Sequence, residues 1–191
     1  MIRFSVLKTN VNISPLFFAV LTAFLLTDKS GTASAAVIFS ILHEAGHFLA
    51  LLCEKSYPKE INISLFGINM SLMEKLSTAE KCAVLMAGFI MNFILAALFF
   101  FIGNYKFAYI NLFIGFFTAM PVPSSDGGSI IKLIFDEYMP EKSEKILKIV
   151  SLSFILLLSA FMIFVLIITK NVFLIFALVY MFLCAIKTAA F

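Results

Sequence analysis

Long runs without charged residues constrain this chain more than any other feature of its sequence. A helix that crosses a bilayer needs about 20 apolar residues, with a range of about 17–25. Runs of roughly this kind occupy residues 9–27, 30–53, 82–105, 107–125, 149–169 and 171–186. Hydrophobic residues make up 62% of the chain and charged residues 13%, far from the balance of a soluble domain. The sequence therefore predicts a mainly α-helical membrane protein with about six transmembrane helices.

The basic residues predict an orientation for these spans. With the N-terminus in the cytoplasm, 11 of the 14 Lys and Arg residues fall inside and 3 outside, as the positive-inside rule expects. Both termini are then cytoplasmic, and the protein is multi-pass. An alternative is that the first run is a signal peptide cleaved after "ASA" at residues 33–35. The net charge of +3 is small and dispersed, so no nucleic-acid partner is expected.

The remaining segments indicate one domain, residues 1–191, with a catalytic core at about 30–136 and helices five and six within 149–190. In "PKEINISLFGINMSLM" (58–73), Ile61, Ile63 and Leu65 alternate with polar residues, and the alternation resumes after Gly67. Alternation around a glycine predicts a short membrane-associated β-hairpin between the second and third helices; an amphipathic interfacial loop is the alternative. The charged segment 136–148 is expected to be a cytoplasmic loop.

The stretch "ILHEAGHFLA" (41–50) places a His-Glu-x-x-His pattern inside the second apolar run. On a helix, His43 and His47 lie on one face, one turn apart, so both imidazoles can reach one Zn²⁺. Glu44 lies beside them and can take a proton from water activated at the metal. Ionisable groups at membrane depth are costly and mark a functional site. The alternative is that these residues only form hydrogen bonds between helices.

A catalytic zinc site needs a third protein ligand and an open position. Other acidic residues lie at span boundaries or in loops, and Glu54 is about 10 Å beyond His47 along a helix. Asp126 follows the fourth run in "AMPVPSSDGGS". Pro121 and Pro123 prevent a regular helix there, so the segment can fold the carboxylate back towards the histidines. Zn²⁺, Asp126 and an ionised Glu44 sum to a neutral site, which suits a low-dielectric setting.

Three motifs in order give the chain a resemblance to a known family. "HEAGH" in the second run, "AGFIMN" (87–92) in the third and "MPVPSSDGG" (120–128) after the fourth resemble the site-2 protease family of intramembrane zinc metalloproteases. The chain is most similar to the bacterial stage IV sporulation proteases, which process a membrane-tethered sigma-factor precursor. The resemblance implies one Zn²⁺ held by His43, His47 and Asp126, with Glu44 as catalytic base and a bacterial plasma-membrane location.

The resemblance also implies that Asn92 lies at the site and that the hairpin borders the substrate path. The expected substrate contacts are the following residues: Asn92, Ile61, Ile63, Leu65, Gly67, Pro121 and Pro123. The chain departs from the family pattern at Phe89, where proline is usual, at Thr118, where asparagine is usual, and at Ser125, where leucine is usual. The sporulation relatives carry a nucleotide-sensing domain after the last helix, and no such soluble regulatory domain is expected here.

The sequence therefore predicts hydrolysis of a peptide bond in or near a transmembrane segment of a membrane-tethered protein. The expected partners are that substrate, the lipid bilayer and regulatory membrane proteins. Two other functions are weighed against this one. A catalytically inactive relative would bind helices as an adaptor, although the intact Glu44 argues against it. A zinc or proton transporter would need polar groups along a path on both sides of the membrane, and the outer half of the spans offers almost none.

Overall fold

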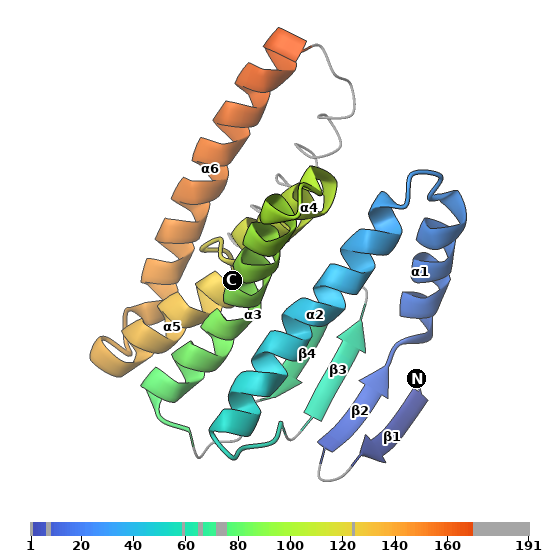
Figure 1. The fold of residues 1–191 in the computed structure, drawn as a ribbon. Coiled ribbons are helices and arrows are strands. Elements are labelled where there is room, and N and C mark those ends of the chain that lie inside the picture. Colours follow the sequence, from blue (N-terminus) through green and yellow to red (C-terminus); the bar gives the residue numbers. More distant parts are fainter. Residues whose placement is uncertain are drawn as a thin grey trace. The chain divides into compact units, whose positions relative to one another are not determined.

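The structure is a computed structural model of the whole chain. It describes residues 2–6, 9–58, 60–64, 67–71, 76–123 and 125–169. The chain divides into two compact units, Met1–Thr118 and Ala119–Phe191 (Figure 1). The predicted sixth span, residues 171–186, lies outside the described residues.

Helices form most of the first unit. Their bounds are α1 Pro15–Thr27, α2 Thr32–Cys53, α3 Thr78–Phe101 and α4 Tyr105–Thr118. Pro15 begins α1 at the position where its missing N–H costs nothing. α3 packs extensively against both α2 and α4, and α2 also contacts α4; these helices are labelled in Figure 1.

A four-stranded sheet completes the first unit. Its strands are β1 Ile2–Val6, β2 Thr9–Ile13, β3 Glu60–Ser64 and β4 Gly67–Ser71. They are ordered β1-β2-β3-β4. β1 pairs with β2 and β3 with β4 in antiparallel fashion, whereas β2 and β3 are parallel, with Asn10 opposite Glu60. β4 therefore lies at an edge of the sheet.

The sheet changes two of the sequence-based expectations. The first apolar run, 9–27, is not one span, because its first five residues form β2 and only residues 15–27 are helical. In segment 58–73, the antiparallel pairing of β3 with β4 belongs to a larger sheet that also contains β1 and β2. Val11 and Ile13 do alternate with Asn10 and Asn12 in "TNVNI", but the segment runs directly into an apolar helix. Its parallel partner is distant in the sequence, so the local pattern does not predict the pairing.

The second unit contains α5 Asp126–Tyr138 and α6 Ser143–Thr169, which pack against each other. The expectation that 136–148 is a loop is wrong. α5 continues to Tyr138, and only a short turn containing Pro140 separates it from α6. The charged side chains of this segment suit exposed helix ends as well as a loop, and Lys132 pairs with Glu144 at 3.7 Å across the two helices.

Among the described residues, three helices are long and apolar enough to cross a membrane: Thr32–Cys53, Thr78–Phe101 and Ser143–Ile168. Large apolar side chains are exposed along them, as Phe101 at 87% and Leu157 at 69% illustrate. Such exposure on several helices is expected of a surface covered by lipid. α1 and α4 are apolar but shorter, and the total of six spans stays a prediction.

Hydrogen bonds at helix starts fix two of the turns in the first unit. Asp28 accepts hydrogen bonds from the backbone N–H and the hydroxyl of Ser34, both at 2.8 Å, and lies just before α2. The Ser34 backbone N–H is the main cause that holds the pKa of Asp28 far below its usual value. At α3, Ser77 and Glu80 form a reciprocal capping box, and the Ser77 backbone N–H lowers the pKa of Glu80.

These lowered pKa values set the sign of a pH effect. A carboxylate whose pKa is lower in the folded state stabilises the fold above its unfolded pKa. The stabilisation is lost as the pH falls through the folded pKa. The ionised carboxylates of Asp28 and Glu80 therefore stabilise their turns fully at neutral pH, and this stabilisation is lost only in acid.

Replacing Ser77 by Ala is expected to destabilise the start of α3. The substitution removes the side-chain acceptor of the Glu80 N–H, and loss of an N-cap typically costs about 1 kcal/mol. Chemical unfolding of the detergent-solubilised protein measures the change. Ser77→Asp, which keeps an acceptor at the cap, is the matched control and should retain most of the stability; equal loss in both variants would contradict the capping role.

Candidate metal centre

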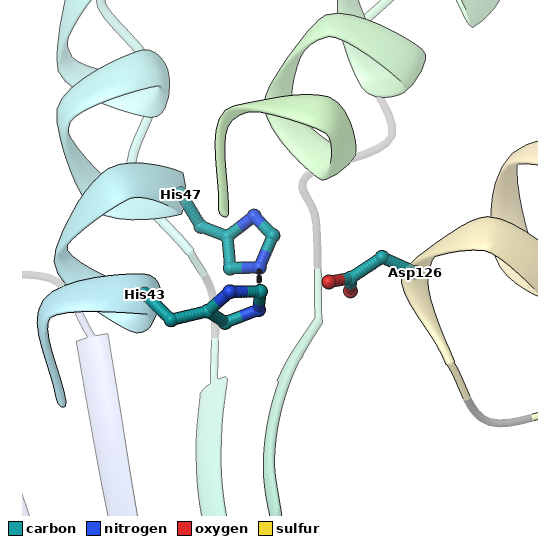
Figure 2. Close-up of side chains that lie close together, drawn as sticks. All are labelled: His43, His47 and Asp126. Atoms are coloured by element: carbon teal, nitrogen blue, oxygen red, sulfur yellow. Dashed lines mark hydrogen bonds between the residues drawn. The ribbon is translucent and has the colours of Figure 1, made fainter. Parts of the chain in front are cut away.

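α2 brings His43 and His47 together on one buried face. Their side chains are 5% and 6% exposed, although the helix exposes large apolar residues elsewhere. The Nε2 atoms of the two rings lie 3.2 Å apart, and the rings meet edge to face with centroids 4.8 Å apart (Figure 2). The spacing of four residues thus places two ring nitrogens at one point, as the sequence predicts.

The other nitrogen of each ring contacts an oxygen. Nδ1 of His47 lies 2.8 Å from the carbonyl oxygen of Val84, and Nδ1 of His43 lies 2.7 Å from Oδ1 of Asn92. A carbonyl oxygen only accepts hydrogen bonds, so each Nδ1 carries the proton. In a neutral imidazole Nε2 then has a lone pair and no proton.

The two lone pairs test whether a metal fits this site. Two unprotonated nitrogens only 3.2 Å apart repel each other unless they share a cation. Imidazole Nε2, with Nδ1–H donated to a carbonyl or amide oxygen, is also the usual form of a histidine that binds metal. The donor set on α2 therefore fits a metal ion held by both histidines.

Gly88 of α3 lies directly against the two imidazoles. A Cβ atom at this position would lie 2.3 Å from Nε2 of His47 and 2.7 Å from Cε1 of His43. On the facing helix, a Cβ at Gly46 would lie 2.7 Å from the carbonyl oxygen of Ala87. Small residues at these two positions let α2 and α3 approach closely, and the approach brings Val84 and Asn92 within reach of the rings.

Asp126 is the first residue of α5 in the second unit. Ser125 caps this helix, because its Oγ accepts the N–H of Gly128 at 3.1 Å and donates to the carbonyl oxygen of Val122 at 2.7 Å. A carboxylate in the first turn is also favoured by the helix dipole. The chain thus presents Asp126 at the end of a capped helix, half-buried.

The segment before Asp126 is held tightly against the start of α5. A Cβ at Gly127 would lie 2.1 Å from the carbonyl oxygen of Ala119, and one at Gly128 would lie 2.0 Å from that of Val122. Only glycine allows backbone to approach this closely. The fully buried Ser151 of α6 donates to the carbonyl oxygen of Pro121 at 2.7 Å, so α6 fixes the proline-containing segment as well.

The structure shows the local surroundings of the three departures from the family pattern. Ser125, where leucine is usual, supplies the cap of α5. Thr118, where asparagine is usual, donates its hydroxyl to the carbonyl oxygen of Ile114 at 3.0 Å within its own helix. Phe89, where proline is usual, lies edge to face with Phe93 at 6.2 Å, and α3 continues through it without the break that proline would introduce.

The predicted substrate contacts occupy several elements. Asn92 is on α3 and fully buried, Ile61 and Ile63 are in β3, and Gly67 begins β4 opposite Ser64. Pro121 and Pro123 lie in the segment before α5, and Leu65 is outside the described residues. Contact with substrate stays a prediction for all of these residues.

Sequence reasoning did not anticipate three contributors. They are the Val84 carbonyl, the close approach at Gly88 and the fully buried amide of Asn111 on α4. A backbone acceptor leaves no sequence signal, and the Gly88 signal lies within the "AGFIMN" motif. Asn111 could have been noticed as an amide inside an apolar run, where polar residues are costly.

Among the described residues, His43, His47 and Asp126 are a group that can hold a metal ion, since each offers one ligand atom. Figure 2 draws the two imidazoles of α2 and the carboxylate of α5. The three residues are those that the sequence predicts as ligands.

The fold of this chain is similar to that of a solved protein. No family model matches the chain, and no curated protein matches it. Among solved structures, it is similar to a site-2 protease from Methanocaldococcus jannaschii, with a TM-score of 0.65. The match covers 98% of this chain and 94% of that one.

The chain has the fold of a site-2 protease. At 20% sequence identity, this similarity shows the fold alone. The fold is the one that the three sequence motifs imply.

Gly88→Ala is expected to remove metal binding. The added methyl group would occupy space within 2.3 Å of Nε2 of His47, so the rings or α3 must move. Zinc per chain, measured on detergent-purified protein after dialysis, should fall clearly below the wild-type value.

Gly115→Ala is the matched control for this substitution. The three heavy atoms nearest to its added methyl group all belong to the ring of Phe93, the closest at 2.9 Å, and none belongs to His43 or His47. Wild-type zinc content in Gly88→Ala would contradict the close approach of α3 to the imidazoles.

Proposed function

We propose that this protein is an intramembrane zinc metalloprotease of the site-2 protease type. The observation that carries the proposal is the pair of buried imidazoles on α2, whose Nε2 atoms lie 3.2 Å apart in a helix long and apolar enough to cross a membrane. The similarity of fold to a site-2 protease supports the same conclusion independently.

In the proposal, His43, His47 and Asp126 hold one zinc ion. Two imidazole nitrogens and one carboxylate are a donor set that suits zinc, and three protein ligands leave a position open for water or substrate. The metal group formed by these residues supports the assignment. With Glu44 ionised, the negative charges of Asp126 and Glu44 balance Zn²⁺. The site then has no net charge, which favours its burial in apolar surroundings.

Glu44 is proposed to be the catalytic base. A zinc ion bound here supplies a Lewis acid that activates water and polarises the scissile carbonyl. Glu44 lies between the two histidines on α2 and is half-buried. Its carboxylate takes the proton from the attacking water and then delivers it to the leaving amine. Proton transfer of this kind contributes roughly 10²–10⁴-fold to the rate.

The edge of the sheet offers a way to present a substrate. Peptide hydrolysis needs an extended segment, because a helix keeps its carbonyls in hydrogen bonds. β4 lies at an edge of the sheet beside β3, and an extended peptide can add to such an edge through backbone hydrogen bonds. We propose that the substrate binds there, near Gly67, and that Pro121, Pro123 and Asn92 belong to its path.

The proposed substrate is a membrane-tethered protein with a segment that can unwind. The motifs that resemble sporulation proteases support a sigma-factor precursor or a similar regulator as its class. The proposed setting is a bacterial plasma membrane, with both termini cytoplasmic, as the distribution of Lys and Arg supports. Regulatory membrane proteins are the further partners proposed.

Glu44→Gln is expected to abolish cleavage without loss of zinc. The amide cannot accept the proton, so turnover of a membrane-tethered substrate should fall by roughly 10²–10⁴-fold, while His43, His47 and Asp126 still bind the metal. Zinc per chain and cleavage in detergent or liposomes are measured on the same preparations.

Asp126→Ala and Asp126→Asn test the third ligand in the same assays. Both variants should lose zinc as well as activity. Asp28→Asn is the matched control, because it changes an aspartate at the α1–α2 turn that accepts hydrogen bonds from Ser34. Full activity in Glu44→Gln, or wild-type zinc content in Asp126→Ala, would overturn the mechanism.

A further inference from the structure

We infer that Asn111 is a positioning residue that sets which ring nitrogen of His43 binds the metal. It acts through Asn92, and the three side chains come from α4, α3 and α2 of the same compact unit. The inference rests on the proposed metal site and adds a residue that no motif includes.

The first hydrogen bond in the series is to a backbone carbonyl oxygen on α4. The amide Nδ2 of Asn111 donates to the carbonyl oxygen of Phe107, 2.9 Å away and one turn earlier on α4. A carbonyl oxygen cannot donate, so the NH₂ group of Asn111 must face it. The oxygen Oδ1 of Asn111 therefore faces the other way, towards Asn92, and it accepts a hydrogen bond from Nδ2 of Asn92 at 3.1 Å.

The orientation of the second amide follows from the first. Nδ2 of Asn92 lies against two acceptors, Oδ1 of Asn111 at 3.1 Å and the carbonyl oxygen of Phe39 at 3.4 Å. Its two N–H bonds are thereby used. Oδ1 of Asn92 must then face His43, where it lies 2.7 Å from Nδ1.

The imidazole of His43 is the end of this chain of hydrogen bonds. Because Oδ1 of Asn92 only accepts, Nδ1 of His43 carries the proton and Nε2 keeps its lone pair. His47 reaches the same state by a shorter route, since the backbone carbonyl of Val84 accepts from its Nδ1. The Phe107 carbonyl thus determines the proton position on His43 through two intervening amides. The Val84 carbonyl determines the proton position on His47 directly.

Burial fixes the orientation of both amides in this series of hydrogen bonds. Asn92 and Asn111 are 0% exposed, so water does not offer an alternative partner to either amide. Turning either amide over would set two acceptors or two donors against each other, and an unsatisfied buried polar group is costly. Polar side chains inside apolar helices often join helices to one another. Here the hydrogen bonds of Asn111 and Asn92 also place the proton of His43 on Nδ1.

The tautomer can be measured without zinc and without a substrate. The chain has only two histidines, so ¹⁵N-histidine labelling of the detergent-solubilised protein reports these two rings alone. In zinc-free wild type at alkaline pH, both rings should carry the proton on Nδ1. Asn111→Leu removes the nearer of the two acceptors of the Asn92 NH₂ group and leaves the longer contact to the Phe39 carbonyl oxygen at 3.4 Å. Asn92 can then turn its NH₂ group towards His43, so the His43 proton should move towards Nε2 while His47 stays unchanged.

Zinc affinity gives the second readout. Competition with a chelator should show binding weakened by roughly 10–100-fold in Asn111→Leu, the usual effect of losing an outer partner of a ligand. Asn111→Asp should keep the wild-type tautomer, because a carboxyl group presents an acceptor to Asn92 whether or not it is protonated. Tyr109→Phe, which removes an exposed hydroxyl from the same helix, is the control and should match wild type in both assays.

Three results would overturn the inference. They are a proton on Nε2 of His43 in wild type, an unchanged His43 tautomer in Asn111→Leu, and the same tautomer shift in Asn111→Asp as in Asn111→Leu. The wild-type spectrum needs no variant, so the inference can fail even if Asn111→Leu does not fold. A wild type with the expected tautomer but no zinc affinity would instead overturn the proposed metal site, and a wild type that binds zinc but cleaves nothing would overturn only the proteolytic function.

Discussion

The structure depends on bringing two imidazole nitrogens together at one point inside an apolar helix. Lipid offers no hydrogen bonds, so each polar atom at this depth must find a partner within the protein. The Nδ1 atoms of His43 and His47 have theirs in Asn92 and Val84. Among the described residues, no buried side-chain nitrogen or oxygen lacks a hydrogen-bond partner. The two Nε2 atoms lie 3.2 Å apart, and in our proposal both bind the metal.

Close packing of α3 against α2 brings Asn92 and the Val84 carbonyl within hydrogen-bond distance of the histidines. Gly46 and Gly88 let α2 and α3 approach until a methyl group would not fit. One turn before His43, the ring of Phe39 meets the rings of Phe99 on α3 and Phe107 on α4 edge to face, with centroids 5.3–5.4 Å apart among the three rings. Small residues at the site and aromatic residues beyond it set the spacing of the three helices. The hydrogen bonds from α4 to α2 require that spacing.

The third proposed ligand is held in a different way. Asp126 follows a segment that proline keeps out of a helix, and the segment is fixed by Gly127, Gly128, the Ser125 cap and the hydroxyl of Ser151. Rigid support of this kind is what a catalytic ligand needs, because small displacements cost much of the rate. Ser125 stands where the family pattern has leucine. Its hydroxyl caps α5, and a leucine side chain has no group that can do so.

The sequence by itself determined the membrane class, the helical site and the three candidate ligands. Local periodicity places His43 and His47 on one face, and elimination leaves Asp126. It did not determine β1 and β2, because the parallel pairing of β2 with β3 joins segments far apart in the chain. It also did not determine the order of hydrogen bonds from Phe107 through Asn111 and Asn92 to His43. That order depends on which atoms of three helices meet, and only tertiary packing decides which atoms those are.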